Sequence, residues 1–169
     1  MDGSRKHLKT AYRLGDFLFY TCLLAVPVVT AVAAILRHSA LWTIVYLLFC
    51  AVAVVLLLKF FCTRCPHYVR KGKTIRCIFF WGFPKLFAPR AGSYDNLDLA
   101  VSGLAAVALA LFPTWWLVRE PILFVVYALS LAGFGAAIYR NECEQCIHME
   151  CPANRAKETL SADADFPVS

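Results

Sequence analysis

Six of the eight cysteines lie outside the apolar stretches of the chain, in two groups whose spacing suits metal binding. The groups begin with Cys62-Thr63-Arg64-Cys65-Pro66-His67 and Cys143-Glu144-Gln145-Cys146-Ile147-His148, so both read C-x-x-C-x-H. One further cysteine follows each group. Thiolate sulfur and imidazole nitrogen together are ligands for zinc, copper and iron-sulfur clusters. We therefore predict a metal ion or cluster, zinc or iron-sulfur, bound by Cys62, Cys65, His67, Cys77, Cys143, Cys146, His148 and Cys151.

The ligands can be arranged in two ways, because a closed zinc site needs four of them. Each group can hold its own metal with its histidine and third cysteine, or the two C-x-x-C pairs can form one four-cysteine site. Proline follows Cys65 and Cys151, as in the cysteine-proline step of bacterial ferredoxins, but the tight four-cysteine run of ferredoxins is missing. A ferredoxin-like cluster would therefore draw ligands from both groups. Basic neighbours such as Arg64 are expected to lower the thiol pKa values.

The two motifs superpose when the chain is aligned on itself at an offset of 81 residues. Each motif follows a pair of apolar stretches, which predicts an internal repeat of one unit, a helical hairpin followed by a motif. The apolar stretches themselves show no convincing similarity, and convergence explains the matched motifs equally well.

Four apolar blocks must position these motifs: residues 17–36, 41–61, 97–118 and 121–139. Each is close to the roughly 20 residues with which a helix crosses a hydrocarbon core of about 30 Å. A composition of 60% hydrophobic and 17% charged residues is too apolar for a soluble domain. Because lipid offers backbone groups no partner, each block must be helical. The predicted fold is an all-α integral membrane protein: one domain over 1–169, an antiparallel four-transmembrane-helix bundle of two helical hairpins with a cytosolic Cys/His-rich cap.

The basic residues predict the orientation. Fifteen Lys and Arg lie on the side of the motifs, against Arg37 and Arg119 in the two hairpin turns. Since Lys and Arg in short loops stay cytosolic, both termini, the basic and aromatic loop 62–96 and the motif segment 140–154 are expected in the cytosol, most simply at a plasma (inner) membrane. The aromatic stretch 78–87 is expected at the lipid interface. The tail 155–169 is expected to be disordered.

An enzymatic alternative comes from the C-x-x-C pairs. A membrane protein with four helices and such pairs resembles, in architecture, the quinone-linked thiol oxidoreductases of the vitamin K epoxide reductase and DsbB types. The resemblance covers the helix number and the C-x-x-C pairs only. It implies thiol-disulfide exchange by Cys62 and Cys65, or by Cys143 and Cys146, with the aromatic residues 79–87 as a quinone contact. Those proteins work on the oxidising side of the membrane, whereas the charge pattern places these motifs on the reducing side.

Other function classes lack support in the sequence. No P-loop, dinucleotide fingerprint or hydrolase motif occurs, and no catalytic residue is predicted. The Lys and Arg residues lie beside the predicted membrane spans, so nucleic-acid binding is not expected. Asp16 and Asp98 lie at predicted helix starts, where a capping role suits them. The expected role is an accessory, anchor or electron-transfer subunit, with the lipid bilayer, a membrane or cytosolic redox partner subunit, and a second copy of the chain as partners.

Overall fold

The computed structural model describes residues 12–69, 72–90, 92, 94–147, 151, 154 and 156. This part of the chain is mostly helical. Four of its helical stretches are long and apolar enough to cross a membrane: Leu14–His38, Ala40–Arg64, Asn96–Leu117 and Pro121–Glu142. They coincide with the four apolar blocks of the sequence. The predicted helical class is thereby confirmed, and helix length and composition indicate an integral membrane protein.

The first half of the chain begins with α1 (Leu14–His38) and α2 (Ala40–Leu56), which are joined by Ser39 alone. Ser39 has an extended backbone, and its hydroxyl accepts a hydrogen bond from the N–H of Trp42 at 3.4 Å. This cap starts α2 immediately after α1 ends. Pro27 lies inside α1 without ending it, as membrane helices often allow.

The second half begins with α4 (Asn96–Leu111), which is followed by α5 (Thr114–Leu117) and α6 (Pro121–Ala137). The third predicted span therefore contains a break that its hydropathy does not predict. Pro113 has no N–H to donate and its ring clashes with the preceding turn, so α4 cannot continue through it. Pro121, in contrast, occupies the first turn of α6, where a missing donor costs nothing.

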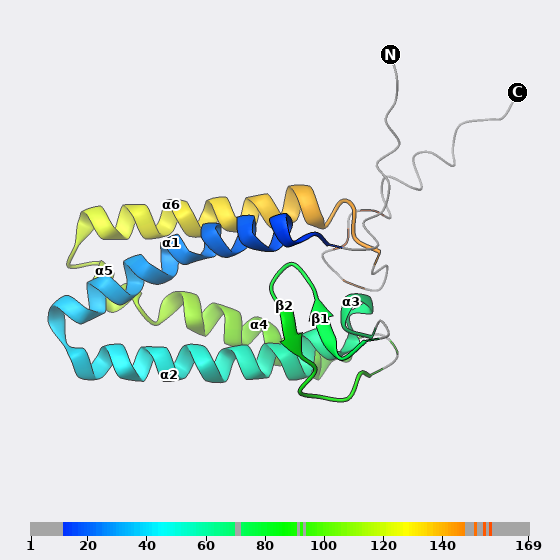
Figure 1. Cartoon of the computed structure of the whole chain (residues 1–169). Helices are drawn as coiled ribbons and strands as arrows, with labels where there is room; N and C mark the ends of the chain where they lie inside the picture. The colour runs from blue at the N-terminus through cyan, green and yellow to red at the C-terminus, as the bar shows by residue number, and fades with distance from the viewer. Residues whose placement is uncertain are drawn as a thin grey trace, which may run out of the picture.

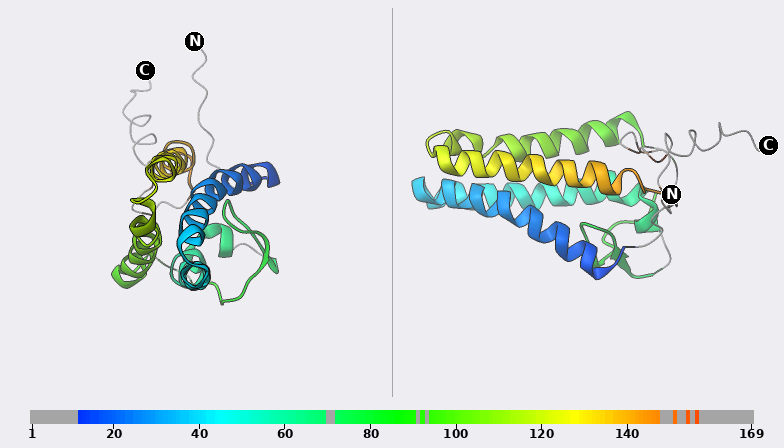
Figure 2. Two further views of the ribbon diagram at one scale, coloured as in Figure 1. Left: turned by 90° about the vertical axis from the view of Figure 1, so that its left-hand side faces the viewer. Right: turned by 90° about the horizontal axis from the view of Figure 1, so that it is seen from above.

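The four long helices lie side by side, and each half packs its first helix against the other half (Figures 1 and 2). α1 runs along α6, and α4 runs along α2. α1 and α4 begin at the same end at which α2 and α6 finish, and both C-x-x-C motifs lie there. We call it the cysteine end, and the opposite end the turn end.

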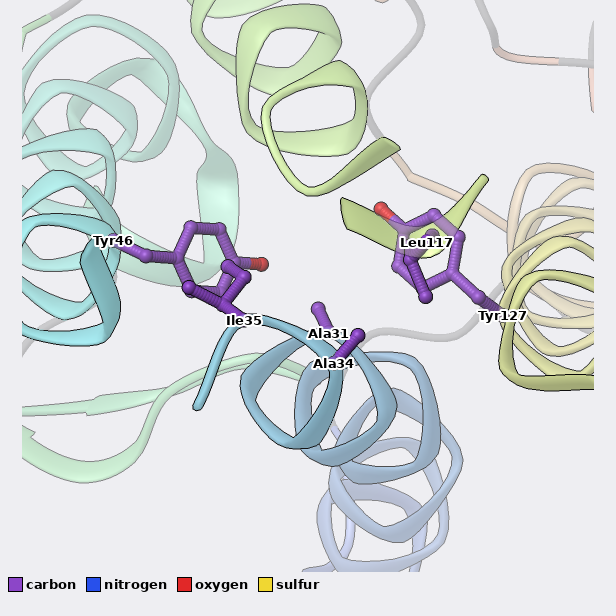
Figure 3. Packing of buried hydrophobic residues seen from close by; sticks show 6 residues of the cluster. All are labelled: Ala31, Ala34, Ile35, Tyr46, Leu117 and Tyr127. Atoms are coloured by element: carbon purple, nitrogen blue, oxygen red, sulfur yellow. The ribbon is translucent and has the colours of Figure 1, made fainter. Parts of the chain in front are cut away.

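The largest buried cluster holds the helices together at the turn end (Figure 3). Its residues come from four different helices: Ala31, Ala34 and Ile35 of α1, Tyr46 of α2, Leu117 of α5 and Tyr127 of α6. Leu117 is completely buried, so the break at Pro113 lets the last turn of the third span reach into this core. The Tyr127 hydroxyl donates to the carbonyl of Ala110 at 2.8 Å, which satisfies its polar atom among apolar neighbours.

The segment between α2 and α4 lies at the cysteine end (Figure 1). It contains α3 (Pro66–Val69) and an antiparallel hairpin of β1 (Thr74–Arg76) and β2 (Trp81–Pro84). The N–H of Cys77 donates to the carbonyl of Phe80 at 3.0 Å and closes the turn of the hairpin. This small sheet departs from the all-α prediction. β-branched and aromatic residues around the turn favour strands there. At the tip of the hairpin, Ile78 is buried against Tyr12 and Tyr20, and the Phe79 ring packs on the Phe134 ring of α6.

Candidate metal centre

Both C-x-x-C motifs directly follow a π-helical turn at the end of a long helix. The first π turn (Leu57–Phe61) continues α2, and the second π turn (Ile138–Glu142) continues α6. In each case the N–H of the first cysteine, Cys62 or Cys143, donates to the carbonyl five residues earlier. π turns are rare and occur often at functional sites. The bounds of α6 and the second π turn are those of α2 and the first, shifted by the same 81 residues as the motifs.

The first motif is packed into the protein. Cys62 is buried with Leu58, Tyr68 and Ile75, and Cys65 packs against the same cluster. The N–H of Cys65 donates to the carbonyl of Cys62 at 2.9 Å, which closes a tight turn between the two thiols. Both thiols are thus fixed by backbone hydrogen bonds at the end of α2.

Cys77 joins this motif from the hairpin, and it packs against the clusters of both the first motif and the α1 start. Burial, together with the neighbouring thiols Cys77 and Cys146, raises the pKa of Cys65 to about 12. Burial also raises the pKa of Cys77, against backbone hydrogen bonds that lower it, and Cys146 again contributes. Cys146 therefore contributes to the raised pKa values of Cys65 and Cys77, although it comes from the other motif.

Two tyrosines flank this group of thiols. Burial raises the pKa of Tyr94, with further contributions from Cys65, Cys151, Cys62 and Cys146. Burial likewise raises the pKa of Tyr12, followed by contributions from Glu142, Cys146 and Cys77. The Tyr12 ring also packs on the buried His67 ring, with centroids 4.8 Å apart. Thiols from both halves of the chain thus contribute to the raised pKa of each tyrosine.

The predicted ligands that the structure describes lie at the cysteine end. Cys62, Cys65 and Cys77 pack in one cluster, and His67 is buried against the ring of Tyr12. Cys143, which follows the second π turn, Cys146 and Cys151 are half-buried. His148 lies outside the described residues. Within the described part of the chain, no three side chains among His, Cys, Asp and Glu are grouped closely enough to hold a metal ion. The donor set, thiols with an imidazole, suits a thiophilic metal, and metal binding stays a prediction.

A buried ion-pair cluster was missed in the sequence. Asp98, in the first turn of α4, is 1% exposed, and its Oδ2 lies 2.6 Å from Nε of Arg64, the residue just before Cys65. Arg64 also pairs with Asp95, and Oδ1 of Asp98 accepts from Arg90 at 3.2 Å. Asp98 also caps α4 by accepting from the N–H of Asp95, which confirms the predicted capping role.

The same cluster corrects the expectation that Arg64 lowers the thiol pKa values. The Arg64 guanidinium is already paired with two carboxylates. Its charge is therefore compensated locally, and burial decides the ionisation of its neighbours, so that the pKa of Cys65 is raised instead.

A second buried carboxylate stands beside the second motif. Glu142, directly before Cys143, is 6% exposed and accepts a hydrogen bond from the Tyr20 hydroxyl at 2.9 Å. Glu142 also contributes to the raised pKa of Tyr12. The second turn of α1, which carries Tyr20, therefore contacts the end of the helix that continues α6. A tyrosine four residues before the helix-start aspartate was the available sequence signal, since Tyr12 precedes Asp16 as Tyr94 precedes Asp98.

No protein-family model matches this chain, and no curated protein or solved structure shows significant similarity to it. The features of the site that bear on function are its thiol and imidazole donor atoms and their burial.

Proposed function

We propose that this chain is a multi-pass membrane protein that binds a thiophilic metal, zinc or an iron-sulfur cluster, through its paired C-x-x-C-x-H motifs. The supporting observation is that Cys62, Cys65 and Cys77 pack in one cluster, although Cys77 comes from the hairpin and not from the first motif. In this proposal the four helices form an antiparallel bundle, and the motifs and both termini face the cytosol, as the excess of Lys and Arg on that side favours.

The state of the thiols favours metal binding over thiol-disulfide exchange. Exchange begins with a free, accessible thiolate, and burial disfavours that form at Cys65 and Cys77. A metal ion brings its own positive charge, which deprotonates a coordinating thiol outright. Burial that suppresses a nucleophilic thiolate is therefore compatible with a metal ligand.

The surrounding structure defines the role of each residue. Cys62 and Cys65 would be held by the turn that ends α2, and Cys77 by the hairpin. Cys146 would be supplied by the segment after α6. Zinc would stabilise this cap, whereas an iron-sulfur cluster would supply one-electron transfer at the membrane surface. The protein would serve accordingly as a metal-stabilised anchor or as an electron-transfer subunit.

The test is elemental analysis, sulfide determination and a visible absorption spectrum on protein purified anaerobically in detergent. Zinc, or iron with inorganic sulfide and a broad visible band, is the expected result. Cys65→Ser should lose the metal, whereas Cys50→Ser, which alters a thiol packed against the turn-end core, should retain it. Metal-free protein with six reactive cytosolic thiols would contradict the proposal and favour thiol exchange.

A further inference from the structure

The segment 72–90, which contains the hairpin, carries positive charge and no acidic residue. Its basic residues are Lys73, Arg76, Lys85 and Arg90. Arg90 is already paired, since its guanidinium lies 3.2 Å from Oδ1 of Asp98. Lys73 and Arg76 are exposed, and no carboxylate among the described residues forms an ion pair with either. Their charge is therefore available to an anion from outside the chain.

Two lysines face each other at the base of the hairpin. The N–H of Lys85 donates to the carbonyl of Lys73 at 3.2 Å, directly after the paired Thr74 and Pro84. Like charges directly opposite each other in an antiparallel pair repel. An anion bound beside the two ammonium groups would relieve this repulsion.

The other end of the hairpin is apolar and faces outward. Residues 77–84 contain no charge, and Phe79 and Phe83 remain 39% and 49% exposed. Seen along the helices, the hairpin lies outside the four long helices, on the side of α1 and α2 (Figure 2, left). In a membrane, these rings would therefore meet whatever surrounds the helices at that depth.

The charged residues of the fourth span indicate what lies at that depth. No charged residue occurs between Glu120 and Arg140, a separation of about 20 residues and about 30 Å, which matches a hydrocarbon core. Phe134 precedes Arg140 by six residues, so it would lie about 9 Å inside this core. The Phe79 ring packs on the Phe134 ring with centroids 6.2 Å apart. The side chain of Phe79 therefore reaches the depth of the acyl chains.

The base of the hairpin lies beyond the end of the second span. Nζ of Lys85 lies over the ring of Tyr68 at 5.6 Å, and Tyr68 comes after Lys59, the first charged residue of that span. The Arg76 guanidinium lies over the Trp81 ring at 6.0 Å. Tryptophan and basic side chains are both typical of the headgroup level of a membrane. The hairpin thus has a basic base for headgroups and an apolar tip for acyl chains.

We propose that this hairpin is a binding site for an anionic phospholipid. Lys73, Arg76 and Lys85 bind the headgroup phosphate, and the acyl chains lie along Phe79 and Phe83. Anionic lipid is preferred over neutral lipid because the segment has no carboxylate to compensate its lysines. The site is separate from the proposed metal ligands, so it stands or fails independently of metal binding.

A lipid titration tests the charge requirement. The full-length chain in neutral detergent is titrated with phosphatidylglycerol or with phosphatidylcholine, and bound lipid is counted by native mass spectrometry. Phosphatidylglycerol should bind in preference. Lys73→Gln combined with Lys85→Gln should weaken its binding about thirtyfold, since each basic residue at an anionic surface contributes about fivefold.

The turn end supplies a matched control. Arg37→Gln combined with Arg119→Gln also removes two charges from one end of the helices, and it should leave phosphatidylglycerol binding unchanged. Parent-like binding by the lysine variant, or an equal loss in the arginine variant, would overturn the site. Inorganic phosphate at the lipid concentration should not displace the lipid, because it lacks acyl chains. Displacement by inorganic phosphate would show a simple anion site and refute the lipid as its occupant.

A fluorescence measurement tests the depth of the hairpin. In vesicles, phospholipids brominated on their acyl chains should quench a full-length chain whose only tryptophan is Trp81, the others being replaced by phenylalanine. The control retains only Trp115, which is 68% exposed at the turn end, and should be quenched as well. Quenching of Trp115 without quenching of Trp81 would overturn the lipid site. Absence of quenching in both chains would contradict the membrane placement on which the site depends.

Discussion

Replacing Asp98 by asparagine should destabilise the cysteine end far more than an ordinary helix-cap change. The Asp98 side chain is 2% exposed and the Arg64 side chain 8% exposed, so the variant leaves a buried guanidinium short of one carboxylate. Removing one partner of a buried ion pair costs about 3–5 kcal/mol. Asp95 still pairs with Arg64 but is 64% exposed, so solvent weakens its compensation.

We therefore expect a loss of about 3 kcal/mol for Asp98→Asn, the lower end of that range, because the amide keeps one acceptor oxygen and Asp95 remains. For a chain of this size the loss corresponds to a decrease in Tm of about 6–12 °C. The measurement is thermal or dodecyl-sulfate-induced unfolding of detergent-purified protein. Adding Arg64→Met should recover about half of the loss or more, since the double variant buries no uncompensated charge.

The internal repeat supplies the matched control. Asp16 occupies the equivalent position of α1 and accepts from the N–H of Arg13 at 3.0 Å, but among the described residues it forms no ion pair. Asp16→Asn should therefore cost about 1 kcal/mol or less, the loss of a cap alone. Similar losses for the two variants would refute the view that the Arg64–Asp98 pair, rather than the cap, holds the first motif.

Three further outcomes follow from the contacts. Tyr20→Phe, which removes the buried hydrogen bond to Glu142, should lower the free energy of unfolding by about 1.5–3 kcal/mol, measured by the same unfolding assay. In metal-stripped protein at pH 8, Cys65 should react with iodoacetamide about a thousandfold more slowly than an ordinary thiol, and the rate should increase as the pH rises. The reason is that only the thiolate reacts, and the pKa of Cys65 is raised from 9.0 to about 12. Mass spectrometry after timed quenching measures the rate, and the rate of an ordinary thiol would contradict the burial of Cys65. Arg37→Gln should change the free energy of unfolding by less than about 1 kcal/mol, since its pair with Glu120 at the turn end is exposed.

The spanning helices could be predicted because hydropathy is a local property. A run of about 20 apolar residues must be helical in lipid whatever surrounds it. The break at Pro113 was equally local and could have been predicted from the proline alone. The hairpin of β1 and β2 was harder, because short strands with aromatic residues resemble an interfacial segment in composition.

The buried ion pair could not be predicted from local sequence. Asp98 carries the signal of a helix cap, and it is one, but Arg64 lies 34 residues earlier, in a C-x-x-C motif. Only the packing of α4 against the end of α2 brings the two side chains together. The incorrect expectation about the thiol pKa values has the same origin, because it treated Arg64 as a free charge.

The two π turns show that the motif ends of the helices are constrained by their tertiary surroundings. Their sequences, Leu-Leu-Lys-Phe-Phe and Ile-Tyr-Arg-Asn-Glu, have in common only a basic residue in third place and an aliphatic first residue. Local propensity therefore does not explain why both adopt the same uncommon turn at the same distance from a C-x-x-C pair. What they share is the cysteine that follows and a tyrosine of the opposite half that donates to their last residue, Tyr94 to Phe61 and Tyr20 to Glu142. These contacts with the opposite half explain how both helix ends keep an uncommon turn that local propensity does not favour, because such conformations persist where the surrounding structure holds them.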